Sequence, residues 1–194
     1  MNLYTMPAVL RETSEGLSRC GIPDIMLQRR EVECVGDIDR EAVYCLALQL
    51  RYLAAEDNSS EIAMYINSPG GSVSDGLALY DVMRALPCPV RTVCLGTAAS
   101  MAALLFAAGA KRDILPHARV MIHDPLTPGV SGSALKLDAV ARDIMRTRET
   151  MARILSEHTG RTLEEVYAKT ATDSFFDAGE AVAWGLADNI ITTL

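Results

Sequence analysis

The chain is poor in basic residues. Its 194 residues contain 18 Lys and Arg against 25 Asp and Glu, which gives a formal net charge of −7. Proteins that bind nucleic acid through a general surface gather Lys and Arg into a basic patch or stripe. The sequence has no such stripe, so we expect no nucleic-acid partner.

Paired cysteines and metal-site spacings are also missing. The five cysteines form no C-x-x-C pair, and their odd number leaves at least one unpaired within the chain. No His, Cys or Asp cluster has the spacing of a zinc site. Reduced thiols in the cytoplasm fit this usage best, because disulfide scaffolds belong to oxidising compartments.

Long apolar segments are few. Only a short apolar stretch precedes Arg11 and Glu12, too short for the hydrophobic region of a signal peptide. The longest uncharged run, residues 92–110, approaches the length of a membrane span but contains Gly96 and Ser100. We therefore expect a buried strand followed by a buried helix, and no membrane partner.

What the sequence does contain is an alternation of strands and helices. With 49% hydrophobic and 22% charged residues, it is typical of one globular domain, here residues 1–194. Repeated strand-helix-strand order favours a largely parallel α/β sheet. Spacing and breaks predict helices over 41–56, 73–86 and 100–108, and strands over 62–66, 90–95 and 119–123.

The second half changes character. A loop starts at Asp124, and residues 133–158 follow the pattern of one long helix. At about 1.5 Å per residue this helix is roughly 39 Å long, more than a domain of this size needs. We expect it to project and to need a partner chain for its apolar stripe of Leu137, Ile144, Met151 and Leu155.

Two short segments point to chemistry. Asn67-Ser68-Pro69-Gly70-Gly71-Ser72 and Gly96-Thr97-Ala98-Ala99-Ser100-Met101 each follow an apolar run and precede a predicted helix. The start of a helix exposes unpaired N–H groups, so a serine hydroxyl and two oxyanion donors can converge there. The Pro-Gly-Gly turn lets a substrate approach the backbone closely. Together the segments predict a serine hydrolase site.

Serine needs a general base, and the chain has three histidines. His117 lies beside a proline in a turn, and His158 ends the long helix. His123 closes an apolar strand, at the end where ligands of parallel sheets usually bind. Alone it is typical of a structural residue at a strand end; together with Ser100 it becomes the predicted base.

Four ordered blocks carry a family resemblance: Tyr65–Val73, Gly96–Met101, Arg119–His123 and His158–Gly160. They resemble the corresponding blocks of the ClpP family, the proteolytic subunits of the ATP-dependent Clp protease, and the similarity runs from about Met6 to Ile191. It implies a crotonase-like α/β fold whose parallel sheet is flanked by helices, with a projecting handle over residues 124–160. It also implies heptameric rings stacked through that handle, and a chamber fed by a AAA+ unfoldase such as ClpX, ClpA or ClpC.

The resemblance assigns roles to residues. Ser100 matches the nucleophile, His123 the general base and Asp173 the third member of the triad. The N–H groups of Gly71 and Met101 match the oxyanion donors. Without the resemblance, Asp173 is typical of a loop carboxylate or a helix cap. The implied activity is that of a serine endopeptidase that degrades unfolded polypeptides without a metal or organic cofactor, ATP being used by the unfoldase. Residues 1–18 match a mobile axial segment.

The sequence departs from the family pattern in several places. Ala171 and Thr172 stand where many members have an aspartate and an arginine that pair between rings, and Asp124 starts a loop that usually reads Gln-Pro-Leu-Gly-Gly. Asp113 matches an aromatic residue of the groove that docks the unfoldase, where a carboxylate disfavours an apolar peptide. The chain is thus either one of two ClpP paralogues in a hetero-oligomer or an ordinary homo-oligomer.

Two other functions remain open at this point. Crotonase-type CoA enzymes share the fold and bind a thioester oxygen with two N–H groups, but they usually act through glutamates. A catalytically silent structural subunit keeps the triad residues in a misaligned arrangement. Changing Ser100 to Ala separates the three possibilities, because only a serine peptidase loses covalent chemistry.

Overall fold

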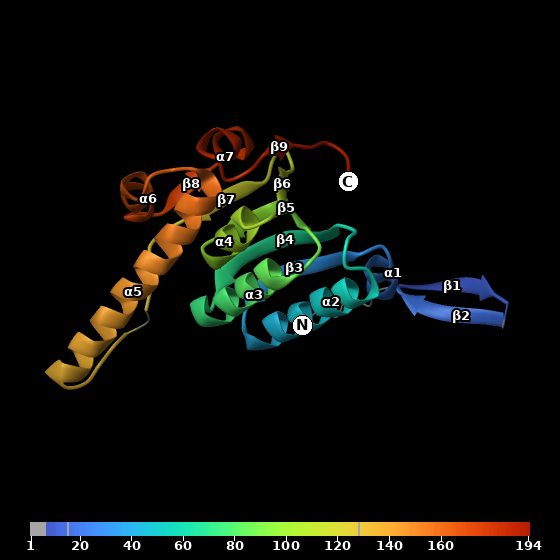
Figure 1. Ribbon diagram of the computed structural model, residues 1–194, viewed down its shortest axis with the longest axis horizontal. Helices are drawn as coiled ribbons and strands as arrows, with labels where there is room; N and C mark the ends of the chain where they lie inside the picture. The colour runs from blue at the N-terminus through green and yellow to red at the C-terminus, as the bar shows by residue number, and fades with distance from the viewer. Residues whose placement is uncertain (1–6, 15, 128) are drawn as a thin grey trace.

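The computed structural model describes residues 7–14, 16–127 and 129–194 (Figure 1). Within these residues seven strands form one sheet. Its main path runs β3 (Glu31–Ile38), β4 (Ile62–Gly71), β5 (Val90–Ala99), β6 (Lys111–Ile114) and β9 (Asn189–Ile190); β7 (Arg119–Ile122) pairs with β5, and β8 (Ser174–Phe176) pairs with β7. Every pairing is parallel except the antiparallel one of β7 with β8. The expected α/β class with a mostly parallel sheet is confirmed.

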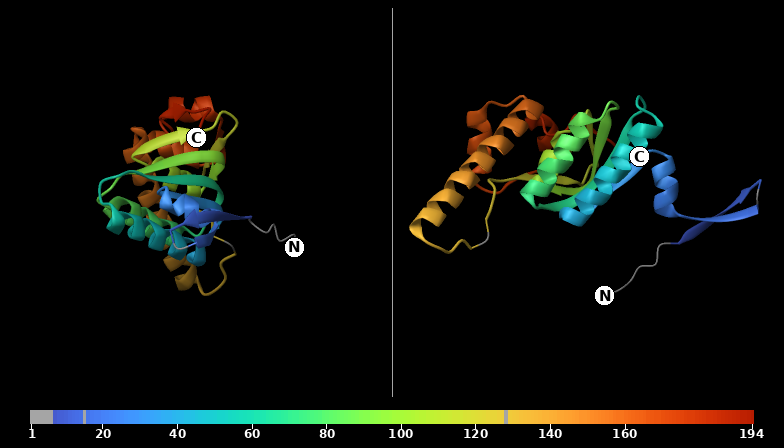
Figure 2. Two further views of the ribbon diagram at one scale, coloured as in Figure 1. Left: turned by 90° about the vertical axis from the view of Figure 1, so that its right-hand side faces the viewer. Right: turned by 60° about the horizontal axis from the view of Figure 1, so that its bottom comes forward.

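Helices flank this sheet (Figures 1 and 2). They are α1 (Ile22–Gln28), α2 (Arg40–Glu56), α3 (Val73–Ala85), α4 (Met101–Ala107), α5 (Ala134–Thr159), α6 (Leu163–Thr170) and α7 (Ala178–Trp184). Helices α2 and α3 pack side by side, and α4 contacts β4, β5, α3 and α5. The predicted helices and strands of the first half are all present, with ends shifted by a few residues.

Strands β4 and β5 are longer than the sequence predicts. Polar and glycine residues after Ile66 and Leu95 indicate turns, yet the strands continue to Gly71 and Ala99. The extension is irregular, because the register between β4 and β5 shifts between Ile66 and Ser68. Such irregularities let a strand include residues that disfavour a regular ladder.

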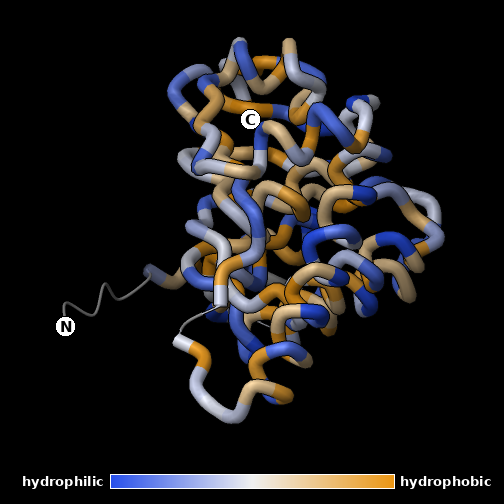
Figure 3. The backbone as a smooth tube through the Cα atoms, turned by 90° about the vertical axis from the view of Figure 1, so that its left-hand side faces the viewer, coloured by the Kyte–Doolittle hydropathy of each residue, from blue (hydrophilic) through white to orange (hydrophobic). Residues whose placement is uncertain are grey.

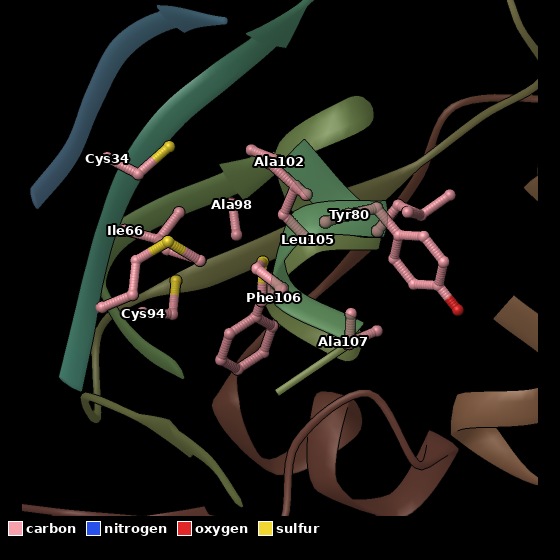
Figure 4. Close-up of a cluster of buried hydrophobic side chains, with 14 of the residues drawn as sticks. Cys34, Ile66, Tyr80, Cys94, Ala98, Ala102, Leu105, Phe106 and Ala107 are labelled. Carbon is pink, nitrogen blue, oxygen red and sulfur yellow. The ribbon is translucent and has the colours of Figure 1, made fainter. Parts of the chain in front are cut away.

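Helix α4 lies at the centre of the core. All seven of its residues are buried, and so is most of the strand before it. Figure 4 shows Ala102, Leu105, Phe106 and Ala107 among side chains of neighbouring elements. The uncharged run 92–110 is therefore a buried strand followed by a buried helix, as expected. In the part of the chain that the structure describes, no helix has both the length and the apolar character to cross a bilayer.

Helix α5 projects from the body (Figures 1 and 2). Its 26 residues are buried only near the C-terminal end, at Met151, Ala152 and Leu155. Towards the free end, Leu135 is 83% exposed and Met145 59% exposed, and Figure 3 shows apolar residues along this projecting part. The predicted projecting helix is confirmed, and several apolar side chains in its projecting part are exposed.

An antiparallel hairpin, β1 (Ala8–Thr13) and β2 (Gly16–Gly21), extends away from the sheet (Figure 1). The predicted axial segment, residues 1–18, overlaps this hairpin. Residues 1–6 and 15 of that segment lie outside the described residues. The described part therefore has regular pairing that the sequence does not indicate.

Arg112, in β6, joins the base of the handle to α7. Its Nη1 donates to the carbonyl oxygens of His158 and Gly185, each at 2.7 Å. Its Nε donates to the Asp188 carboxylate at 3.1 Å. These carbonyls lie at helix C-termini, where no partner exists within the helix. We expect Arg112→Met to lower the free energy of unfolding by about 2 to 3 kcal/mol. The change leaves two carbonyls without this donor and removes the guanidinium from Asp188, whose carboxylate keeps the backbone N–H of residue 112.

The matched control is Arg84→Met, which removes an exposed ion pair with Glu157 at 3.9 Å near the same end of the handle. Exposed pairs contribute little, so this change is expected to cost less than about 1 kcal/mol. Denaturant unfolding at one fixed protein concentration compares the two variants. Equal losses would show that Arg112 has no special role.

Candidate active site

Strand β7 brings together residues that are far apart in the sequence. It pairs in parallel with β5, with Ala99 opposite Met121, and antiparallel with β8, with Ile122 opposite Ser174. The carboxyl ends of parallel strands meet at one edge of a sheet, and an antiparallel neighbour begins at that edge. The residues that follow β5 and β7 and precede β8 are Ser100, His123 and Asp173. The topology thus explains why the three meet.

Ser100 occupies an unusual backbone conformation. Its φ of 55° and ψ of −123° lie outside the regions that residues with a Cβ normally adopt. The turn is held from both sides: Ser100 N–H donates to Met121 O at 2.8 Å, and Ser100 O accepts from Ala103 N–H at 3.0 Å. Strained residues of this kind cluster at functional sites. The turn directs the hydroxyl towards β7.

The Ser100 hydroxyl meets the imidazole of His123. Its Oγ lies 2.7 Å from His123 Nε2, within hydrogen-bond distance. The His123 side chain is only 11% exposed. The other histidines lie elsewhere: His117 is exposed, and His158 Nε2 is 3.2 Å from the Tyr80 hydroxyl. Burial lowers the pKa of His158, which favours its neutral form.

Asp173 lies on the far side of the imidazole. Its Oδ1 is 3.7 Å from His123 Nδ1, longer than a hydrogen bond, and its side chain is 64% exposed. The structure therefore brings all three predicted triad residues together, but with the serine–histidine contact tight and the histidine–aspartate contact open.

The predicted oxyanion donors, Gly71 and Met101, lie close to Ser100 along different segments of the chain. Met101 begins α4 directly after it. A Cβ added to Gly70 would lie 2.8 Å from Ser100 Cβ and 3.1 Å from Met101 N, so the end of β4 passes directly against the serine turn. Gly71, the next residue, has a φ of 155° and packs equally closely against the backbone of Ile38. Both predicted donors thus lie in the two segments that meet at Ser100.

The family model for Clp protease matches residues 15–194. The chain belongs to the Clp protease family. The resemblance drawn from four short blocks is confirmed, and the mixed α/β fold agrees with it. Membership makes the chain a ClpP-type protease subunit, and implies a serine peptidase that assembles into oligomeric rings with Clp ATPases. It favours peptide hydrolysis over the CoA chemistry of crotonase enzymes.

Two polar side chains, to which the sequence alone assigns no role, hold the segments of the site together. Asn67 Oδ1 accepts from Thr97 N–H at 3.1 Å, across the register shift between β4 and β5. Ser68 is fully buried, and its hydroxyl accepts from Gly70 N–H at 3.1 Å. Two polar residues at the end of a buried strand, just before the Pro-Gly-Gly turn, are the signal in the sequence that could have identified them. They fix the glycine segment relative to the serine segment.

The sequence-based placement of Asp113 is wrong. Its side chain is fully buried and lies 2.6 Å from Arg91, so it does not face a docking groove of this chain. Burial acts to raise the pKa of Asp113, but hydrogen bonds from Asn189 and Arg91 outweigh it and the pKa lies below its ordinary value. The carboxylate joins β5, β6 and β9 and gives no ground for weakened unfoldase docking.

The buried thiols of Cys34 and Cys94 do not compete with Ser100 as the nucleophile. Burial raises the pKa of Cys34 to about 11 and that of Cys94 to about 12, so the reactive thiolate is scarce at neutral pH. Among residues 7–14, 16–127 and 129–194, no group of three His, Cys, Asp or Glu side chains is placed to hold a metal ion.

Proposed function

We propose that this chain is the serine endopeptidase subunit of an ATP-dependent Clp protease, with Ser100, His123 and Asp173 as its triad. The observation that carries the proposal is the 2.7 Å contact between Ser100 Oγ and His123 Nε2. A neutral imidazole at this distance can take the hydroxyl proton as the oxygen attacks a peptide carbonyl.

The reaction then follows from the positions of the groups. Attack by Ser100 forms a tetrahedral oxyanion beside the N–H groups of Gly71 and Met101, which we propose as its donors. His123 returns its proton to the leaving amine, and an acyl ester remains on Ser100. Water, deprotonated by His123, attacks this ester; His123 then returns the proton to Ser100 Oγ as the second product, a carboxylic acid, leaves. A general base typically contributes about 10²- to 10⁴-fold, and one oxyanion donor roughly 10²- to 10³-fold.

Asp173 is proposed to orient the imidazole and to stabilise its protonated form. The 3.7 Å separation in the isolated chain is close enough for a small loop movement to form the hydrogen bond. Catalytic hydrogen bonds are often long without substrate and shorten in the reactive complex.

The proposed setting is an oligomer of stacked heptameric rings in the cytoplasm, which receives unfolded polypeptide from a AAA+ unfoldase. The projecting α5 supports ring stacking, since the apolar side chains of Leu135, Leu137 and Met145 are exposed on it. The free cysteines support a reducing compartment. No cofactor enters the proposed chemistry, and both a homo-oligomer and a hetero-oligomer with a ClpP paralogue are compatible with it.

The test is intact-protein mass after treatment with a fluorophosphonate probe. We expect one adduct per chain on the wild type and none on Ser100→Ala, because the probe reacts only with an activated serine. Ser74→Ala removes an exposed hydroxyl on α3 and serves as the matched control, which keeps the adduct. A folded wild type without an adduct would contradict the proposal and favour the catalytically silent subunit.

A further inference from the structure

Asp124, the residue directly after His123, contacts two helices at once. Its N–H donates to Thr170 O at 2.7 Å, and its Oδ1 accepts from the Thr170 hydroxyl at 2.7 Å. Its Oδ2 accepts from Arg148 Nε at 2.6 Å. Thr170 ends α6, and Arg148 lies in the handle helix α5. One carboxylate thus connects the strand of the histidine to both helices.

Arg148 is held on two sides. Besides the carboxylate, its guanidinium lies 4.2 Å from the centre of the Tyr167 ring in α6. The side chains of Arg148 and Asp124 are 25% and 32% exposed. A partly buried, charge-assisted pair with a stacked guanidinium keeps one geometry much better than a free surface pair. The contact therefore fixes α5 and α6 relative to Asp124.

The loop that carries Asp173 is short and fixed at both ends. At its start, Thr170 is bonded twice to Asp124. At its end, Ser174 pairs with Ile122, and its hydroxyl donates to Lys169 O at 2.7 Å. Only residues 171–173 lie between these anchors. The position of the Asp173 carboxylate relative to His123 depends on both anchors, and one of them is Asp124.

We propose that Asp124 and Arg148 are positioning residues for the triad: their ion pair, acting through Thr170, sets the distance between Asp173 and His123. The inference rests on the proposed peptidase function and adds to it. It also gives the handle helix a direct connection to the active site, because Arg148 belongs to the same helix as the projecting segment.

The test measures two things. Intact-protein mass over time gives the rate constant of fluorophosphonate labelling, and steady-state kinetics on a small peptide gives kcat and KM. We expect Asp124→Ala and Arg148→Met each to lower the labelling rate and kcat by roughly 10- to 100-fold, as for a misplacement of about 1 Å. KM is expected to stay within about twofold, and the fraction of chains finally labelled to stay unchanged. Arg148→Lys, which keeps the charge, should recover part of the rate.

The double variant tests the coupling. If the pair acts as a unit, Asp124→Ala with Arg148→Met is no slower than the slower single variant. Loss of Asp124 and loss of Arg148 change the local charge in opposite directions, so a direct charge effect on His123 predicts opposite changes in rate. The matched control is Arg153→Met, which breaks an exposed pair with Glu149 on the same helix and should leave the rate unchanged.

Each remaining outcome decides against the inference. Wild-type rates in both single variants overturn it, as does additivity in the double variant. A smaller labelled fraction at an unchanged rate shows that the pair only supports folding. A folded wild type that takes no label refutes the proposed function, and this inference with it, whereas a labelled wild type with unaffected variants refutes the inference alone.

Discussion

Replacing His123 with Gln is expected to lower kcat for peptide hydrolysis by about 10⁴-fold or more, since loss of a triad histidine removes the general base outright. Glutamine can still hydrogen-bond to Ser100, but it cannot accept the hydroxyl proton. No other histidine can replace it, because His117 is exposed on a turn and His158 is bonded to Tyr80. Steady-state kinetics on a small peptide, with KM and kcat separated, measures the effect.

The control for this change is His158→Gln. It removes a half-buried imidazole near the base of the handle and leaves the contact between Ser100 and His123 in place. We expect kcat to stay within a few-fold of the wild type. Comparable losses in the two variants would mean that histidine removal acts through folding, and the proposed base would have to be abandoned.

Replacing Gly70 with Ala is expected to lower kcat by about 10²-fold or more, because the new methyl group displaces the nucleophile. Its Cβ would lie 2.6 Å from Ala99 O and 2.8 Å from Ser100 Cβ, and the backbone cannot yield without moving the serine turn. The φ of +98° also disfavours a residue with a side chain. We expect a loss of about 1 to 3 kcal/mol in the free energy of unfolding.

Gly36→Ala separates these two causes. Gly36 has a similar φ of +83°, but a Cβ there would meet nothing within 4 Å. Its variant should share the backbone strain, seen as a loss of stability in denaturant unfolding, and should keep the wild-type kcat. If Gly36→Ala and Gly70→Ala lose activity equally, close contact with Ser100 is not the reason for the glycine.

Much of the fold could be predicted because its elements have strong local patterns. The strands 62–66 and 90–95 are continuous apolar runs, and α2, α3 and α5 show helical spacing. Strand β3 was missed although Val32, Cys34 and Ile38 are buried at near-alternate positions. Strand β6, Lys-Arg-Asp-Ile, gives no such signal; it is a strand because β5 and β9 supply partners on both sides.

The sequence by itself determined the chemistry at two residues. A serine at the end of one buried strand and a histidine at the end of another are drawn together by any parallel sheet that pairs those strands. Tertiary structure decided the rest. Asp173 reaches the site only because β8 runs antiparallel to β7. Asp113 is a buried ion-pair partner only because β6 pairs with β5, which brings the Arg91 side chain within 2.6 Å. Such contacts depend on which distant segments become neighbours, and no local pattern of residues encodes that.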